Sequence, residues 1–252
     1  MVTLLAGCGG DGGKKAEGDG GVANPPQAEL ASLIGDQGAV RFRLDAPDAA
    51  RFTTVVLAAR GLPESERKCA APAVGAVLSP DAEGRVSLAR FGRLVNRLAD
   101  GGSDLSKQVA GCLSDATKQR IADERPADDL DLAGFLDLAH RMASGQAAAV
   151  GMTPTEAACY AQHALEGVDP QKFVRAVVGY EDTQGADPVG AVEDCVPRER
   201  LTELVVSGRK MKAAYEQCVR ERAEEQANAV NEALSSSTTQ AGVTTTTLPP
   251  CA

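Results

Sequence analysis

Seven cysteines and two histidines are the residues of this chain whose types could support metal or redox chemistry. Cys159 and His163 lie four residues apart, a spacing that puts both side chains on one face of a helix and suits two metal ligands. No second half-site of comparable quality follows, and His140 is the only other histidine. In an oxidising compartment a disulfide would consume Cys159. We therefore expect neither a metal site nor a cofactor.

The acidic stretch DDLDLAGFLDLAH has part of the spacing of a calcium-binding loop. Asp129, Asp131, Gly134 and Asp137 occupy the first, third, sixth and ninth positions of such a loop. The twelfth position, where a calcium loop places a bidentate glutamate, is His140. Because that ligand is missing, we expect a solvated acidic helix start, where negative charge is favourable, and no calcium site.

The sequence offers little for nucleophilic catalysis. It contains no Gly-x-Ser-x-Gly elbow and no phosphate-binding loop. Neither histidine lies beside a suggestive nucleophile. We therefore name no catalytic residue and favour a non-enzymatic protein, although an enzyme whose site residues are dispersed along the chain stays open as the alternative.

The start of the chain resembles the signal of a bacterial lipoprotein. Residues 5–8, Leu-Ala-Gly-Cys, match the box at which such signals are cleaved so that the cysteine becomes the lipidated N-terminus. The resemblance implies a lipid on Cys8. The preceding MVTLLAG has no basic residue and a shorter apolar stretch than the usual ~7–15 residues. Either a longer signal is truncated here, which we favour, or the match is a coincidence.

Composition and charge limit the fold and the partners. Hydrophobic residues make up 43% of the 252 residues, but aromatics only 3%, and tryptophan is absent. A core of Ala, Val and Leu suits closely packed helices. The net charge of −9 argues against nucleic acid as a partner. After Gly7 no apolar run approaches the ~20 residues of a spanning helix.

An internal repeat organises the middle of the chain. Phe91 aligns with Phe173, and each is followed by a cysteine, after 21 residues in one copy and 22 in the other. The aligned segments are 61–78 with 151–168, 91–112 with 173–195 and, as a third, partial copy, 200–218 with 51–69. The match is a pattern of apolar positions and cysteines, and it indicates a duplication.

Capping signals predict helices in the second copy. Thr153-Pro154-Thr155-Glu156 is a capping box, and the Asp-Pro pairs at 169 and 187 repeat the signal. The expected helices are 154–167, 170–181, 188–195 and 198–207. Ser79-Pro80 is a similar start in the first copy, ahead of an apolar stripe from Leu88 to Leu98. Only residues 39–45 alternate like a strand, and a lone strand has no partner.

The predicted fold is all-α, built from duplicated units that disulfides staple. We divide the chain into a truncated signal with its lipid box (1–8), a flexible tether (9–38), helical unit 1 (39–125), helical unit 2 (126–207), a charged helix (208–234) and a disordered Thr-rich tail (235–252).

If Cys8 carries lipid, an even number of cysteines is left, as expected of an oxidised exported protein. The duplication favours pairing within units, Cys69 with Cys112 and Cys159 with Cys195. Two alternatives are open for Cys218: a bridge to Cys251, or a free or intermolecular thiol.

The stretch TPTEAACYAQHALEGVDPQKF and the following DPVGAVEDC resemble the helical Cys-pair repeats of exported proteins of high-GC bacteria. The resemblance covers residues 150–196 well and 61–112 loosely. It implies a disulfide-linked helical module outside the cytoplasm and transfers no activity.

From these features we expect a lipid-anchored protein on the extracytoplasmic face of the cell membrane, or a secreted one if the lipid box is not processed. Its expected role is that of a binding or structural module with an envelope protein as partner. The alternative is an extracytoplasmic hydrolase or metal-dependent enzyme.

Overall fold

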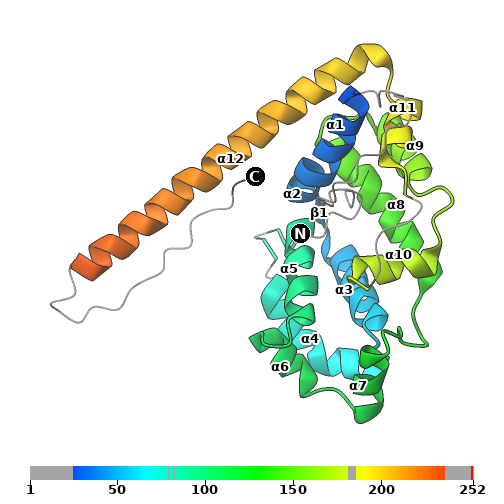
Figure 1. Ribbon diagram of the computed structural model, residues 1–252, viewed down its shortest axis with the longest axis vertical. Coiled ribbons are helices and arrows are strands. Elements are labelled where there is room, and N and C mark those ends of the chain that lie inside the picture. Colours follow the sequence, from blue (N-terminus) through cyan, green and yellow to red (C-terminus); the bar gives the residue numbers. More distant parts are fainter. Residues whose placement is uncertain (1–24, 79, 82, 181–185, 236–250, 252) are drawn as a thin grey trace, which may run out of the picture.

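A computed structural model describes residues 25–78, 80, 81, 83–180, 186–235 and 251 (Figure 1). As predicted, it is an all-α protein. Its elements are α1 (Pro25–Leu33), the π-helical turn η1 (Ile34–Gly38), α2 (Ala39–Arg41), β1 (Arg43–Leu44), α3 (Ala46–Ala59), α4 (Glu64–Leu78), β2 (Val86–Ser87), α5 (Leu88–Ala99), α6 (Asp104–Ala110), α7 (Asp115–Ala122), α8 (Leu132–Ala149), α9 (Pro154–Ala164), α10 (Pro170–Val177), α11 (Pro188–Cys195) and α12 (Arg198–Ser235). None of these described helices is long and apolar enough to cross a bilayer.

Each predicted unit contains the same order of four helices, α3 to α6 in the first and α8 to α11 in the second. The first helix of each set packs a phenylalanine against one from the third. Phe52 meets Phe91 edge-on with ring centroids 4.7 Å apart, and Phe135 lies 5.5 Å from Phe173. This recurrence supports the duplication, and these aromatic pairs supply large buried side chains in a chain that has few.

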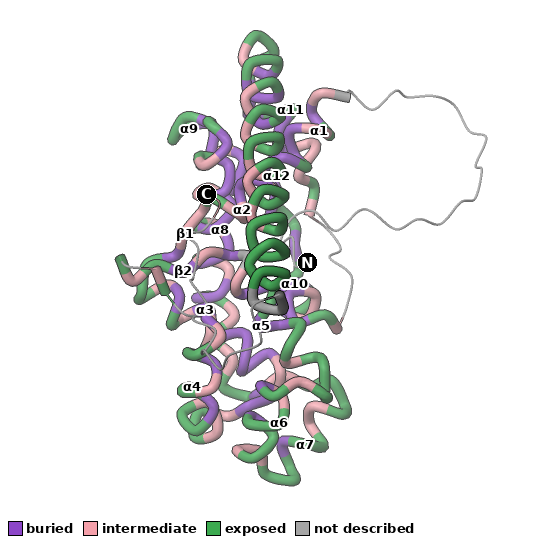
Figure 2. The backbone as a smooth tube through the Cα atoms, turned by 90° about the vertical axis from the view of Figure 1, so that its left-hand side faces the viewer, coloured by how far each residue is buried: buried purple, intermediate pink, exposed green. Residues whose placement is uncertain are grey.

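The two units share one hydrophobic core. Helix α3 of the first packs against α8 and α10 of the second, and a single cluster of buried side chains, mostly Ala, Val and Leu, runs through both. Figure 2 shows these buried segments along the inner sides of the helices. The units are therefore repeats within one continuous core.

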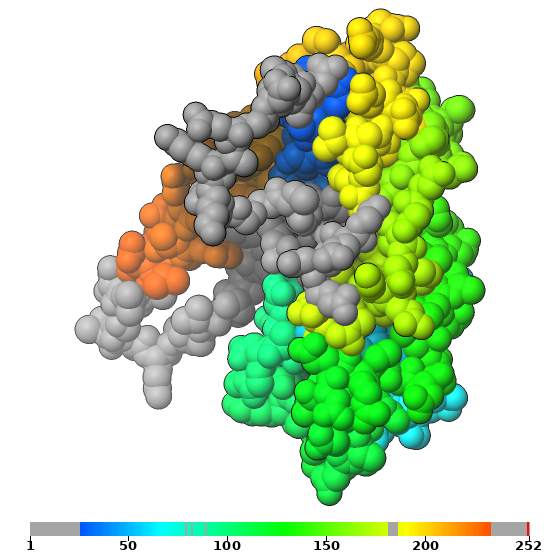
Figure 3. All heavy atoms as spheres, turned by 45° about the vertical axis from the view of Figure 1, so that its right-hand side comes forward, coloured from blue at the N-terminus to red at the C-terminus, as the bar shows by residue number. Residues whose placement is uncertain are grey.

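The predicted flexible tether, 9–38, is too long at its C-terminal end. Residues 25–38 form α1 and η1, and Leu30 and Ile34 are completely buried. In Figure 3 the blue α1 lies against the yellow start of α12 and the end of α11, in agreement with their contacts. Leu30, Leu33 and Ile34 lie at helical spacing and form an apolar face along α1 and η1. The Gly-rich stretch before them led to the prediction that the tether continues to residue 38. Residues 1–24 lie outside the described part, as do 236–250 and 252 of the predicted tail.

Three smaller predictions also change. The strand predicted within 39–45 has a partner, because Arg43–Leu44 pairs antiparallel with Val86–Ser87. No helix begins at Pro80; the predicted stripe belongs to α5, which starts at Leu88. The segments 198–207 and 208–234 form the single helix α12, so the third partial copy lacks the break that separates α3 from α4.

The capping box of α9 forms as predicted and also joins α9 to α12. The Thr153 hydroxyl accepts from the Glu156 amide at 3.3 Å, and Glu156 Oε2 accepts from the Thr153 amide at 2.8 Å. Arg200, in the first turn of α12, donates to Glu156 Oε1 at 2.7 Å and to the Gly151 carbonyl at 3.3 Å. Burial raises the pKa of Glu156, but the hydrogen bonds from Thr153 and Arg200 outweigh it, so the pKa lies below its usual value of 4.5.

Glu156→Gln should lower the free energy of unfolding at pH 7 by about 1–2 kcal/mol, because it weakens a nearly buried, charge-assisted contact. Ionised Glu156 stabilises the fold above its unfolded pKa of 4.5, and this contribution disappears as the pH falls through the lower folded-state pKa. Urea titrations of both proteins from pH 7 to pH 3 measure the difference, which should shrink below pH 4.5. Glu199→Gln, an exposed change in the same turn as Arg200, is the control. An equal loss in both variants would contradict the assignment.

Candidate functional site

The two predicted cysteine pairs both form. Cys69 joins Cys112, and Cys159 joins Cys195, each pair with a Cα–Cα distance of 5.7 Å. In each unit the bridge ties the second helix to the end of the fourth. Of the two alternatives for Cys218, the structure has the bridge to Cys251. Cys8 lies outside the described residues.

The Cys159–His163 pair meets a third potential ligand at the second disulfide. The ligand atoms of Cys159, His163 and Cys195 all lie within 4.8 Å of one another. His163 Nδ1 lies 3.5 Å from Asp194 and 3.6 Å from Glu166. Metal binding by cysteine requires thiolates, however, and both sulfurs are held in the disulfide. In its oxidised form this cluster is a structural link between α9 and α11.

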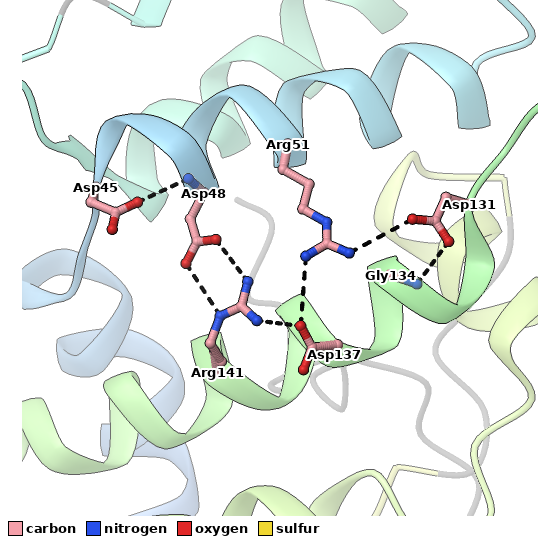
Figure 4. Close-up of polar contacts among 7 residues, drawn as sticks. All are labelled: Asp45, Asp48, Arg51, Asp131, Gly134, Asp137 and Arg141. Carbon is pink, nitrogen blue, oxygen red and sulfur yellow. Dashed lines mark hydrogen bonds and ion pairs between the residues drawn. The ribbon is translucent and has the colours of Figure 1, made fainter.

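The acidic residues that have part of the spacing of a calcium-binding loop contact arginines at the interface between the two units. Figure 4 shows Arg51 of α3 between Asp131 and Asp137, at 3.7 and 3.6 Å. Arg141 of α8 pairs with Asp137 one turn earlier and donates to Asp48 of α3 at 2.7 Å. Asp131 also caps α8, since it accepts from the Gly134 amide at 2.8 Å.

The aspartate at the first calcium-loop position, Asp129, forms a two-point ion pair with Arg67, with distances of 3.0 and 2.7 Å. The guanidinium holds the pKa of Asp129 below its usual value. These three aspartates thus contact three arginines, Arg51, Arg141 and Arg67, and one of them caps a helix. The arrangement fixes the packing of α3 and α4 on the second unit.

Arg141→Gln should lower the free energy of unfolding by about 1 kcal/mol, because it removes a bridge between α3 and α8 that is partly screened by solvent. A double-mutant cycle with Asp48→Asn isolates the pair, with chemical denaturation as the measurement. Calcium should leave the unfolding midpoint of the wild-type protein unchanged, since no spare carboxylate cluster is present along this stretch. A midpoint that rises with calcium concentration would show that the loop binds the ion after all.

A cleft of about 440 Å³ lies between the middle of α12 on one side and, on the other, α5 and the paired strands β1 and β2 of the first unit. We call it the arginine cleft, after the five residues in its lining: Arg43, Arg85, Arg90, Arg93 and Arg222. Asp81 is the one acidic side chain among the described residues that line it. In a chain with a net charge of −9, this is a local concentration of positive charge.

Asp81, in the loop before β2, organises the side of the arginine cleft that the two strands form. Its Oδ2 lies 3.7 Å from Arg43 Nε and 3.6 Å from Arg85 Nε, and its Oδ1 accepts from the Arg85 amide at 2.8 Å. The Arg85 amide is the largest cause of a lowered pKa at Asp81, and the Glu83 amide adds to it. Asp81 is therefore ionised at neutral pH and holds two of the guanidinium groups in place.

His140, the other candidate from the sequence, lines a neighbouring depression of about 590 Å³ with Asp45, Asp48 and Ser144. These residue types could make a triad. Among the described residues, however, His140 has no hydrogen bond to Ser144 or to either aspartate. Asp48 instead pairs with Arg141, and Asp45 caps α3. The depression has the components of a catalytic site without its contacts.

Two Ser-x-x-Lys spacings, Ser65–Lys68 and Ser207–Lys210, also occur in the chain. Lys68 is exposed and pairs with Glu64 at 2.8 Å, and Lys210 is exposed on α12. A lysine that activates a serine is normally desolvated, so neither pair has the surroundings of a nucleophile.

No protein-family model matches the sequence, and the comparisons with curated proteins and with solved structures give no match either.

Proposed function

We propose that this chain is an exported, lipid-anchored binding or structural module of a bacterial cell envelope. It stands on the extracytoplasmic face of the membrane, held by lipid on Cys8, and its helical units bind a partner or ligand there. Among the described residues, the depression around His140 is the feature that favours the alternative, an extracytoplasmic hydrolase or metal-dependent enzyme.

The observation that carries the proposal is the use of the cysteines. Six of the seven are paired with one another in three disulfides. Stable disulfides are typical of proteins in oxidising compartments outside the cytoplasm. The seventh, Cys8, has none of the other six available as a partner, and it occupies the cysteine position of the Leu-Ala-Gly-Cys box. A lipid on Cys8 therefore accounts for the remaining cysteine.

The binding role is supported by how the polar residues are used. The carboxylates of the calcium-like stretch and the sulfurs beside His163 are engaged in contacts that hold helices together. The arginine cleft, in contrast, gathers positive charge that the described residues neutralise only in part. A concave site with convergent polar groups is the usual form of a ligand site.

Cys8→Ser should release the protein from the membrane fraction when it is expressed from its natural locus in the bacterium, because the thiol that would carry the lipid is lost. The wild-type protein should carry lipid at an N-terminal Cys8, which intact mass spectrometry of the membrane fraction measures. Multiple acyl chains are expected, since one chain binds only marginally.

Cys218→Ser is the matched control, because it removes one cysteine of a disulfide and leaves the lipid box intact. It should remain in the membrane fraction. A wild-type protein that is recovered outside the membrane fraction with an unmodified Met1 or Val2 N-terminus would overturn the proposal.

A further inference from the structure

We propose that the arginine cleft binds a small ligand through a phosphate group that carries at least two negative charges. The inference deepens the proposed binding role and rests on it, but it does not depend on the lipid at Cys8.

The first argument is the surplus of charge in the arginine cleft. Arg43 and Arg85 share Asp81, and Arg85 has Glu83 as a further partner. The charge of two further arginines is not compensated. Arg93 of α5 and Arg222 of α12 line the cleft, and within the described part of the chain neither guanidinium has an ion pair or a hydrogen bond.

The second argument is that part of the lining is already fixed. Arg43 Nη1 donates to the Val40 carbonyl at 3.1 Å, and Arg90 Nη1 donates to the Leu78 carbonyl at 2.9 Å. The side chains of Arg43 and Arg90 are partly buried. Guanidinium groups that are held in place lose less entropy when a ligand binds than free ones do.

The third argument concerns the wall that α12 provides. Tyr215, Arg222 and Gln226 are spaced by about two and one helical turns and line the same side of the cleft. Cys251, which the disulfide fixes to Cys218 of this helix, lines it as well. The third disulfide thus holds a residue from the C-terminal end of the chain at the wall of the cleft. The helix supplies one arginine together with a phenol and an amide as hydrogen-bonding groups.

The ligand class follows from charge and geometry. The planar fork of each arginine matches two oxygens of a phosphate or a carboxylate. Several arginines from different elements around one space of about 440 Å³ favour a compact group with high charge, as a phosphate monoester or a diphosphate has, over a single carboxylate. This volume lies within the range of small-ligand sites.

Calorimetric titration of the oxidised full chain with pyrophosphate tests the inference. We expect one site whose affinity falls as salt is added, because the contacts are electrostatic. The variant Arg93→Gln with Arg222→Gln should weaken binding at least about tenfold. Neither guanidinium has an ion pair or hydrogen bond to a described residue, so the variant should keep the fold, which its circular dichroism and unfolding midpoint check.

The matched control is Arg97→Gln with Arg220→Gln. It also removes one positive charge from each of the helices α5 and α12, but at exposed positions outside the cleft lining. Its affinity for pyrophosphate should stay within about twofold of the wild type, allowing for screened long-range charge. Equal weakening in both double variants would show a general charge effect and overturn the inference.

A phosphate of this kind can belong to a free molecule or to a lipid headgroup. Phosphatidylcholine vesicles with and without phosphatidic acid separate these sources, with co-sedimentation as the measurement. Loss of vesicle binding in the cleft variant alone supports the headgroup, and pyrophosphate binding without vesicle binding supports a free ligand. Binding of neither overturns the inference. The proposed membrane anchoring would still stand, because the modification of Cys8 is measured separately.

Discussion

A disulfide between the second helix and the end of the fourth helix of each unit is the constraint on which this fold depends. The helices that it joins are short, and short helices are marginal in isolation. The bridges close loops of 43 and 36 residues, and each contributes about 4 kcal/mol in the chain-entropy account. With so few aromatic residues, the core alone has limited means to fix α4 on α6 and α9 on α11.

In addition to these disulfides, charged side chains fix how the two units pack against each other. Arg51 and Arg141 face aspartates across the interface of α3 and α8, and Arg200 ties the start of α12 to the capping box of α9. These pairs act on packed helices, where even modest energies select one arrangement. The arginine cleft differs from these interfaces because its charged side chains line an open cleft. That contrast separates the part of the surface that is suited to binding from the parts that maintain the fold.

Much of the architecture could be predicted because its signals are local. The capping box at Thr153 and the Asp-Pro pairs indicated where helices begin, and the duplication predicted both intra-unit bridges. The buried α1 was missed because a Gly-rich stretch precedes it, although Leu30, Leu33 and Ile34 have helical spacing. The pairing of β1 with β2 was missed because residues about forty positions apart make it.

The arginine cleft could not be predicted from the sequence. Its five arginines come from β1, the turn before β2, α5 and α12, and no spacing links Arg43 to Arg222. Only the path of α12 past the first unit brings them together. The contacts of the acidic stretch could not be predicted for the same reason, because they join residues that are far apart in the sequence. Its arginine partners Arg51 and Arg67 lie in the other unit, so the sequence could show the missing calcium ligand but not what the carboxylates contact.

Peptide mapping of the natural protein without reduction tests the central claim most directly, since fold, compartment and the leftover Cys8 all depend on the pairing. The account predicts linked peptides for Cys69–Cys112, Cys159–Cys195 and Cys218–Cys251 only. Free thiols at the first four of these positions, or peptides that link one unit to the other, would contradict it.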